Sequence, residues 1–189
     1  MNARTLARAA GAALAIVAAA PLVPASATAA HAQAPAARPL ASPRDTAEAT
    51  VAGARVMVDY GRPYKRGRQI YGNLVPSNAV WRTGANASTT LVTDRPLRMG
   101  STTIPAGKYS LYSLWTGSAW NLIVNKQTGQ WGTQYDQTQD LARIPLKVTT
   151  VAAPVEQFTI AVEPKGKSGV LSLTWDDKRG EVPFTVAAK

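Results

Sequence analysis

The fold class is decided by residues 109–125, which read Tyr-Ser-Leu-Tyr-Ser-Leu-Trp-Thr-Gly-Ser-Ala-Trp-Asn-Leu-Ile-Val-Asn. The first part has the aromatic and large apolar content of a strand, and Thr116-Gly117-Ser118 then supplies a turn. In the part that follows, Trp120, Leu122 and Val124 share one face of an extended chain, because side chains alternate along a β-strand. The stretch therefore predicts two neighbouring antiparallel strands.

Short strand-like runs continue on both sides of this stretch. No segment of twelve residues shows helical periodicity, whereas Gly, Pro, Asn and Asp separate runs of alternating or β-branched residues. The other expected strands are residues 55–60, 89–93, 97–99, 102–104, 147–152, 158–163, 170–175 and 182–186. Residues 176–180, Asp-Asp-Lys-Arg-Gly, are expected to form the loop of the last hairpin. About nine strands at this spacing predict an all-β fold, an antiparallel β-sandwich or jelly roll.

Two long connections interrupt the strands, at residues 62–86 and 127–145. Both are rich in charged, aromatic and amide side chains, and long ordered loops on a rigid scaffold often carry function. Helix is expected only as one or two short turns, between residues 66 and 80 or between residues 136 and 141. We therefore expect the functional residues to lie in these two connections.

The N-terminal residues have the features of a secretory signal peptide. Arg4 and Arg8 precede an apolar run at residues 11–20, and small-x-small cleavage sequences follow at residues 25–27 and 30–32. The apolar run is shorter than the ~20 residues that a transmembrane helix needs. We therefore expect an exported bacterial protein, periplasmic or extracellular, without a transmembrane segment. The expected organisation is a signal peptide at residues 1–32, a flexible leader at 33–44 and a single domain at 45–189.

The composition excludes several kinds of chemistry. The chain has no cysteine, so disulfides, thiolate nucleophiles and cysteine-ligated zinc are ruled out, and its single histidine is His31. Cleavage after Ala32 removes that histidine, and with it the usual imidazole base and the commonest metal ligand. Loss of Arg4 and Arg8 leaves 19 basic against 11 acidic residues, a net charge of +8. We therefore expect a basic protein with no metal site and no cofactor.

Two sequence motifs connect the chain to a known family. Residues 60–72 read Tyr-Gly-Arg-Pro-Tyr-Lys-Arg-Gly-Arg-Gln-Ile-Tyr-Gly, and residues 81–86 read Trp-Arg-Thr-Gly-Ala-Asn. Over residues 42–186 the chain resembles a bacterial exported family, domain of unknown function 2911. Arg66 and Ala87 depart from its pattern, which has lysine at the first position and often an acidic residue at the second. The family has no established reaction, cofactor or ligand, so the resemblance implies an exported protein and leaves its activity open.

A basic cluster lies in the first connection. Four cations fall within seven residues and alternate with tyrosines, and these cations are Arg62, Lys65, Arg66 and Arg68. Arginine binds carboxylate, phosphate or sulfate with two parallel hydrogen bonds, so an anionic ligand is one interpretation. In the other interpretation some of these arginines hold the long connection in place by pairing with a carboxylate, for which the candidates are Asp59, Asp136 and Asp140. No nucleic-acid-binding module is recognised, so nucleic acid is not an expected partner.

The hexapeptide at residues 81–86 offers a second set of candidates. Trp81 is expected in the core, Arg82 adds another cation, and Thr83 and Asn86 either cap a turn or face a ligand. If the strands before and after the first connection are neighbours, both motifs emerge at one end of the sheet and form one site. The expected ligand-binding residues are then Tyr60, Arg62, Arg68, Arg82, Thr83 and Asn86.

Three functions remain open at this point. The first is a binding module for an anionic or hydroxylated ligand; the second connection, rich in amides and aromatic rings, has the composition of carbohydrate clefts. The second is a hydrolase of envelope or extracellular glycans that uses Asp136 and Asp140 as its carboxylate pair. The third is a structural envelope protein, whose motif residues only fix the long connections. The sequence leaves the ligand and the oligomeric state open.

Overall fold

Strands make up most of the structure, a computed structural model that describes residues 41–187. They are β1 Arg44–Val51, β2 Ala54–Gly61, β3 Val80–Trp81, β4 Thr89–Thr93, β5 Leu97–Met99, β6 Thr102–Ile104, β7 Gly107–Trp115, β8 Trp120–Asn125, β9 Asp140–Lys165 and β10 Ser168–Val186. The only helical element among the described residues is a 3-10 turn, η1, at Gln137–Gln139. The predicted all-β fold is confirmed, and η1 lies in one of the two places predicted for a helical turn. The predicted signal peptide and residues 33–40 of the predicted leader lie outside the described residues.

The strands form one antiparallel sheet that does not close on itself. Its order is β1-β2-β4-β7-β8-β9-β10-β5-β6, and β3 also pairs with β7. The hairpin predicted at residues 109–125 is present as β7 and β8, with Leu111 opposite Val124. β2 and β4 are neighbours, with Val58 opposite Leu91. The segment that leaves β2 and the segment that enters β4 therefore lie at the same end of the sheet.

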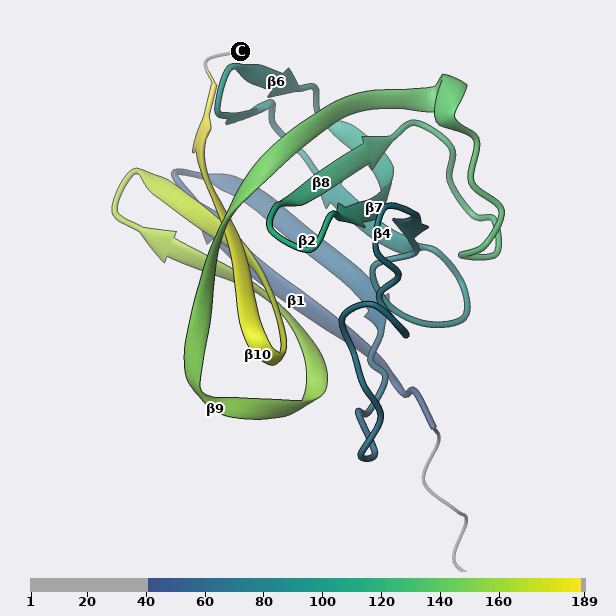
Figure 1. Cartoon of the computed structure of the whole chain (residues 1–189). Helices are drawn as coiled ribbons and strands as arrows, with labels where there is room; N and C mark the ends of the chain where they lie inside the picture. Colours follow the sequence, from purple (N-terminus) through teal and green to yellow (C-terminus); the bar gives the residue numbers. More distant parts are fainter. Residues whose placement is uncertain (1–40, 188–189) are drawn as a thin grey trace, which may run out of the picture. The chain divides into compact units, whose positions relative to one another are not determined.

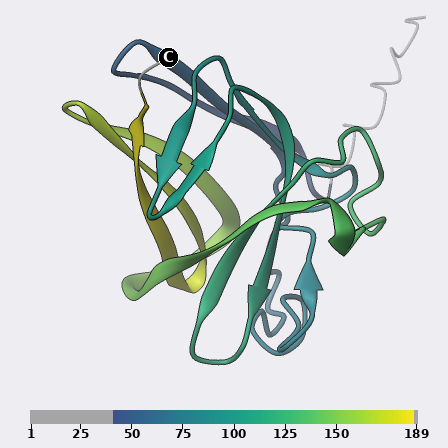
Figure 2. The same cartoon turned by 90° about the horizontal axis from the view of Figure 1, so that it is seen from above.

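The long strands β9 and β10 carry the sheet from one half of the molecule to the other. β9 begins beside β8, where Ile144 lies opposite Leu122, and ends beside β10, where Ile160 lies opposite Leu173. In Figures 1 and 2 the ribbon of β9 runs from η1 across the molecule and then turns back beside β10. Residues from both halves form a single buried core, as in a sandwich of two layers.

The structure corrects the interpretation of residues 176–180 as a hairpin loop. This segment lies inside β10, which continues to Val186 without reversing. Asp176 has a left-handed backbone with a φ of 51°, and the pairing with β9 shifts register on both sides of it. Such a β-bulge bends a strand and absorbs an extra residue, so the turn-like sequence produces a bend. Four expected strands therefore merge into two, with residues 147–152 and 158–163 in β9 and residues 170–175 and 182–186 in β10.

The edge strand β1 has no clear signal in the sequence. It reads Arg-Asp-Thr-Ala-Glu-Ala-Thr-Val, and most of its residues are exposed. Its conformation comes from pairing, because every residue has a partner in β2, from Arg44 opposite Gly61 to Val51 opposite Ala54. The buried neighbour, and not the local composition, makes this segment a strand.

An aromatic cluster fills the core beneath the hexapeptide. Trp81 packs edge-on against Phe158, with ring centres 5.0 Å apart, and stacks on Trp175 at 5.7 Å. Tyr60 packs against Phe158 from β2, at 5.8 Å, and all four side chains are buried. Aromatic pairs at these separations stabilise a core by about 0.5–1.5 kcal/mol beyond the burial of their area. The predicted place of Trp81 in the core is confirmed.

Residues 62–65 are anchored to the middle of β9. The N–H of Phe158 donates to the carbonyl of Pro63 at 2.9 Å, and the N–H of Lys65 donates to the carbonyl of Glu156 at 2.7 Å. These bonds hold the start of the first long connection on a rigid part of the sheet. The basic cluster therefore begins from a fixed position.

Candidate anion-binding site

A tight turn carries two arginines of the basic cluster. The N–H of Arg68 donates to the carbonyl of Lys65 at 3.0 Å, and Arg66 and Gly67 have positive φ values of 48° and 69°. The N–H of Arg66 also donates to a carboxylate oxygen of Glu156 at 2.7 Å. Because a left-handed backbone is readily adopted by glycine, Gly67 suits this turn. Both arginine side chains are exposed on the same loop.

The backbone of this turn also holds the guanidinium of Arg68. Its Nε donates to the carbonyl of Lys65 at 3.0 Å, and its Nη2 donates to the carbonyl of Tyr64 at 2.6 Å. The guanidinium of Arg66 lies 5.6 Å from the ring centre of Tyr64, a distance suited to a cation–π contact. Within residues 41–187, neither arginine forms an ion pair.

The backbone of the hexapeptide packs closely against the end of β2. A Cβ at Gly61 would overlap the carbonyl oxygen of Ala85, and a Cβ at Gly84 would lie 2.9 Å from the carbonyl oxygen of Gly61. Thr83 and Asn86 have positive φ values of 49° and 64°, which are uncommon for residues other than glycine. Strained backbone of this kind is often found at binding sites, where the surrounding structure holds it in place.

Hydrogen bonds to its neighbours hold the hexapeptide in this conformation. Thr83 is buried, and its hydroxyl donates to the hydroxyl of Ser113 at 3.0 Å. The hydroxyl of Thr89 donates to the carbonyl of Thr83 at 2.6 Å, and the N–H of Gly132 donates to the carbonyl of Asn86 at 2.9 Å. The Thr83 hydroxyl therefore helps to stabilise the turn, one of the two roles that the sequence allows for it, whereas the contact of Asn86 is made by its backbone carbonyl. Neither residue lines the cavity described below.

Arg82 extends from the hexapeptide to the surface. Its Nε donates to the carbonyl of Gly84 at 3.3 Å. Its aliphatic stem packs on Gly132, where a Cβ would come within 2.8 Å of Arg82 Cδ. The stem is therefore supported by protein while the guanidinium remains available, an arrangement typical of partly buried arginine.

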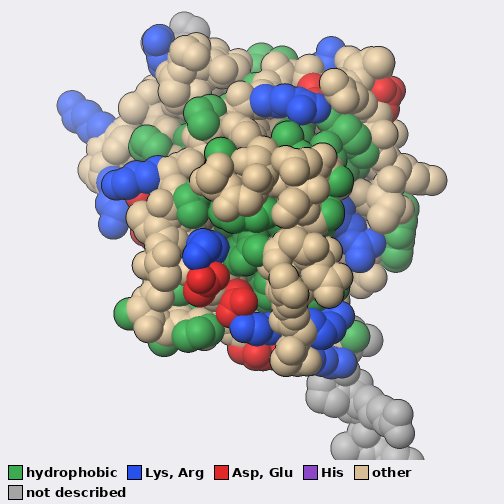
Figure 3. All heavy atoms as spheres, in the orientation of Figure 1, with side chains coloured by type: hydrophobic (Ala, Val, Ile, Leu, Met, Phe, Trp, Pro, Cys, Tyr) green, Lys and Arg blue, Asp and Glu red, His purple; other side chains and the backbone are tan. Residues whose placement is uncertain are grey.

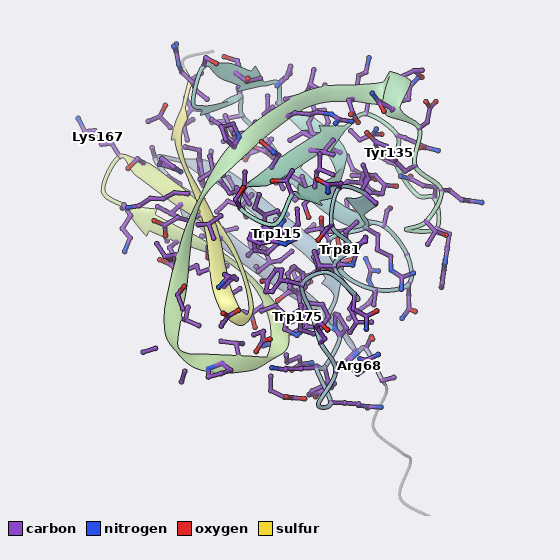
Figure 4. All side chains as sticks on the ribbon, in the orientation of Figure 1. Arg68, Trp81, Trp115, Tyr135, Lys167 and Trp175 are labelled. Atoms are coloured by element: carbon purple, nitrogen blue, oxygen red, sulfur yellow. The ribbon has the colours of Figure 1, made fainter. Side chains whose placement is uncertain are left out.

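Arg66, Arg68 and Arg82, the cavity arginines, line a single cavity of about 200 Å³. Its walls also include the stacked rings of Trp81 and Trp175, and Figure 4 shows both tryptophans beside the loop that carries Arg68. In Figure 3, Lys and Arg side chains gather at the lower right, the region where Figure 4 labels Arg68. None of the described residues that line the cavity carries a carboxylate. The arrangement can therefore bind an anion.

Two predicted residues of the first motif lie outside this cavity. Tyr60 is buried in the core, and burial raises the pKa of its hydroxyl. Arg62 donates from Nε to the carbonyl of Phe158 at 3.1 Å and from Nη2 to the hydroxyl of Thr159 at 2.9 Å, and it pairs with Asp45 at 3.1 Å. Arg62 therefore holds β1 and β9 together, and its partner Asp45 is not one of the three carboxylates expected from the sequence.

Asp136 and Asp140 are both engaged in structural hydrogen bonds. The carboxylate of Asp136 accepts from the hydroxyl of Thr138 at 2.7 Å and from its N–H at 2.9 Å, which lowers the pKa of Asp136. The carboxylate of Asp140 accepts from the hydroxyl of Tyr135 at 2.6 Å and from Arg143 at 2.9 Å. Burial, together with the bond to Asp140, raises the pKa of Tyr135 to about 12. These bonds favour a structural role for the two carboxylates.

The cavity combines predicted residues with one that the sequence does not indicate. Arg68 and Arg82 are predicted ligand-binding residues, and Arg66 belongs to the predicted basic cluster. Trp175 comes from the distant strand β10, and no spacing in the sequence relates it to the hexapeptide. Its place in the cavity wall follows only from the pairing of strands across the whole domain.

A known protein family matches the chain over nearly all of its described length. This family is described as "Protein of unknown function (DUF2911)", and it matches residues 42–184. No curated protein and no solved structure matches the chain. Across the described range, no helix is long and apolar enough to cross a membrane, and no three His, Cys, Asp or Glu side chains are grouped so as to hold a metal ion.

Proposed function

The chain belongs to DUF2911, a family of proteins of unknown function, and we propose that it is an exported protein that binds a ligand through an anionic group. The anion would lie among the guanidinium groups of the cavity arginines. Export is proposed from the charge, apolar run and cleavage sequences of residues 1–32.

The observation that carries the proposal is that the three cavity arginines line one cavity and that none of its described lining residues carries a carboxylate. By contrast, Arg62 pairs with Asp45, and Arg143 pairs with Asp140. Like charges that share a cavity repel each other, and at a separation of 4 Å this repulsion would be about 1 kcal/mol in water and about 4 kcal/mol at the effective dielectric of a protein surface. A bound anion would replace this repulsion with attraction.

The protein holds two of the cavity arginines in position before any ligand binds. Backbone carbonyls fix the guanidinium of Arg68 at two points and that of Arg82 at one. A guanidinium has five N–H donors, so further donors remain for a ligand. Donors that are already oriented lose less conformational freedom on binding. Carboxylate, sulfate and phosphate groups all match the planar fork of arginine.

Sulfate and phosphate are the simplest probes of this site. Calorimetric titration of the purified protein with either anion, at constant ionic strength, is expected to show saturable binding. Arg68→Gln and Arg82→Gln should each weaken it about 10-fold or more, because a hydrogen bond to a charged group contributes roughly 1.5–3 kcal/mol.

Arg98→Gln is the matched control for Arg82→Gln. Arg98 is exposed, and its Nε donates to the carbonyl of Gly100 at 3.4 Å, much as Arg82 donates to Gly84. This variant loses the same charge at a distant place and should bind sulfate as the unchanged protein does. Absence of saturable binding, or an equal loss in the two variants, would contradict the proposal.

A further inference from the structure

We infer that the ligand is an acidic saccharide, whose charged group lies among the cavity arginines and whose sugar ring lies in a second cavity beyond Arg82. This inference rests on the proposed function and names the class of ligand that the same site would take.

The second cavity has a volume of about 530 Å³ and adjoins the first. Leu74, Trp81 and Arg82 line both cavities. In Figure 4, Arg68, Trp175, Trp81 and Tyr135 follow one another from the bottom of the view upward. Arg68 and Trp175 line the first cavity, Trp81 lines both and Tyr135 lines the second. Ligand sites commonly have volumes of about 300–1,000 Å³. A ligand that spans both cavities would therefore contact Arg82 at its centre.

The lining of the second cavity is apolar on its floor and polar on its rim. The floor is formed by aliphatic and aromatic side chains, namely Leu74, Pro76, Val80, Trp81, Tyr112 and Tyr135. Asn73 and Thr133 are exposed at the rim, and within the described part of the chain their side chains form no hydrogen bond. A sugar ring has an apolar face of C–H groups and a perimeter of hydroxyls. Such a floor can cover that face while an amide and a hydroxyl bind the perimeter.

The two tyrosines at the far end favour a sugar over the planar base of a nucleotide. The rings of Tyr112 and Tyr135 are inclined at 57° with centres 4.8 Å apart, so they offer no pair of parallel faces for a base. Their hydroxyls favour neither ligand, because both already have partners: Tyr112 donates to the carbonyl of Gln134 at 3.2 Å and Tyr135 donates to Asp140. The polar groups that remain for a ligand are those of the rim and Arg82.

Calorimetry with four ligands measures the contribution of each cavity to binding. Sulfate tests the anion site alone, trigalacturonic acid tests both cavities, its methyl ester tests the rings without charge, and adenosine monophosphate tests a nucleotide. Trigalacturonic acid should bind about 10-fold or more tighter than sulfate, because it adds hydrogen bonds and apolar burial in the second cavity. The methyl ester should bind at least about 10-fold more weakly than the acid, because it lacks the charged hydrogen bonds. Adenosine monophosphate should bind no tighter than inorganic phosphate.

A variant of the rim tests the second cavity independently of the first. Asn73→Ala combined with Thr133→Ala should lower the affinity for trigalacturonic acid about 10-fold, because two hydrogen bonds to the ligand are lost. The affinity for sulfate should change by no more than about twofold. Asn121→Ala combined with Thr149→Ala removes the same two side-chain types outside both cavities and should change neither affinity. Thermal unfolding of both double variants shows that they are folded.

The possible failures of the two proposals are distinguishable. If sulfate binds through Arg82 but trigalacturonic acid binds no tighter, or the rim variant loses no affinity for it, the saccharide inference is wrong and the anion site stands. If adenosine monophosphate binds at least about 10-fold tighter than phosphate, the ligand class is a nucleotide, which also overturns the inference. If no probe binds, the proposed function fails and the inference fails with it.

Discussion

Arg62 donates a hydrogen bond from Nε to the carbonyl oxygen of Phe158 at 3.1 Å and so ties the end of β2 to the middle of β9. The two residues are 96 positions apart in the chain. The first motif therefore contains arginines of two kinds. The guanidinium of Arg62 is hydrogen-bonded within the protein and pairs with Asp45, whereas Arg66 and Arg68 line a cavity.

Arg62→Gln is expected to destabilise the protein by about 2 kcal/mol, because it removes hydrogen bonds to Phe158 and Thr159 that are each worth roughly 0.5–1.5 kcal/mol. The ion pair with Asp45 adds little, since the aspartate side chain is 45% exposed and solvent screens it. Arg82→Gln should change the free energy of unfolding by no more than about 0.5 kcal/mol, because glutamine keeps part of the stem that packs on Gly132 and the hydrogen bond that is lost, to Gly84 at 3.3 Å, is long. Urea unfolding measures the free energy of unfolding of both variants. An equal decrease in the two would contradict a structural role for Arg62 and a ligand-binding role for Arg82.

Gly61→Ala is expected to destabilise the protein severely, by about 3 kcal/mol or more, because the new Cβ would overlap the carbonyl oxygen of Ala85. Gly67→Ala is the comparison variant. Gly67 has a φ of 69° with open space around it, so alanine there should cost only about 1–2 kcal/mol of backbone strain. The melting temperatures of the two variants distinguish the effect of steric overlap, at Gly61, from that of backbone strain, at Gly67. A smaller loss of stability in Gly61→Ala than in Gly67→Ala would contradict this prediction and show that the hexapeptide can shift away from the new Cβ.

Acid is expected to destabilise the protein partly through Glu163. The hydrogen bond and charge of Arg179 lower the pKa of Glu163, so the ionised form favours the folded state. That stabilisation is present above the unfolded pKa of about 4.3 and disappears as the pH falls through the lower folded value. Arg179→Gln should therefore reduce the difference in melting temperature between pH 7 and pH 3. Arg98→Gln serves as the control, and an unchanged difference in the Arg179 variant would exclude this pair as a source of pH dependence.

Export is expected to leave a mature N-terminus between Thr28 and Gln33, because small residues recur just beyond the apolar run. N-terminal sequencing of the protein recovered from the exported fraction of the producing cell measures this position. Protein from that fraction that still begins at Met1 would contradict the signal-peptide interpretation and, with it, the export part of the proposed function.

The fold could be predicted where the signal is local. Alternation along a strand is a local property, so residues 109–125 indicated β7 and β8, and residues 89–93 matched β4. The hairpin loop predicted at residues 176–180 was wrong, because Asp-Asp-Lys-Arg-Gly has the composition of a turn but its conformation depends on the register with β9. β1 was missed because its strand conformation depends on pairing with β2.

The site could be predicted only in part for the same reason. Arg68 and Arg82 stand in recognisable motifs, and the adjacency of β2 and β4 brings those motifs to one end of the sheet. The contacts that distinguish Arg62 from Arg68 involve β9, at positions that no local pattern indicates. Trp175 enters the cavity wall from β10 through the same long-range packing.

The contacts around the cavity also bear on folding kinetics. The Tyr60 hydroxyl meets β9 across 100 residues of chain, and Lys65 pairs with Asp176 across 111. Chains rich in such non-local contacts have high contact order and fold slowly, because the entropy of loop closure is lost before the contacts form. We therefore expect the cavity to be completed late, on the native side of the folding barrier. An anion bound there would slow unfolding and leave the folding rate nearly unchanged, so occupancy would lengthen the lifetime of the folded protein.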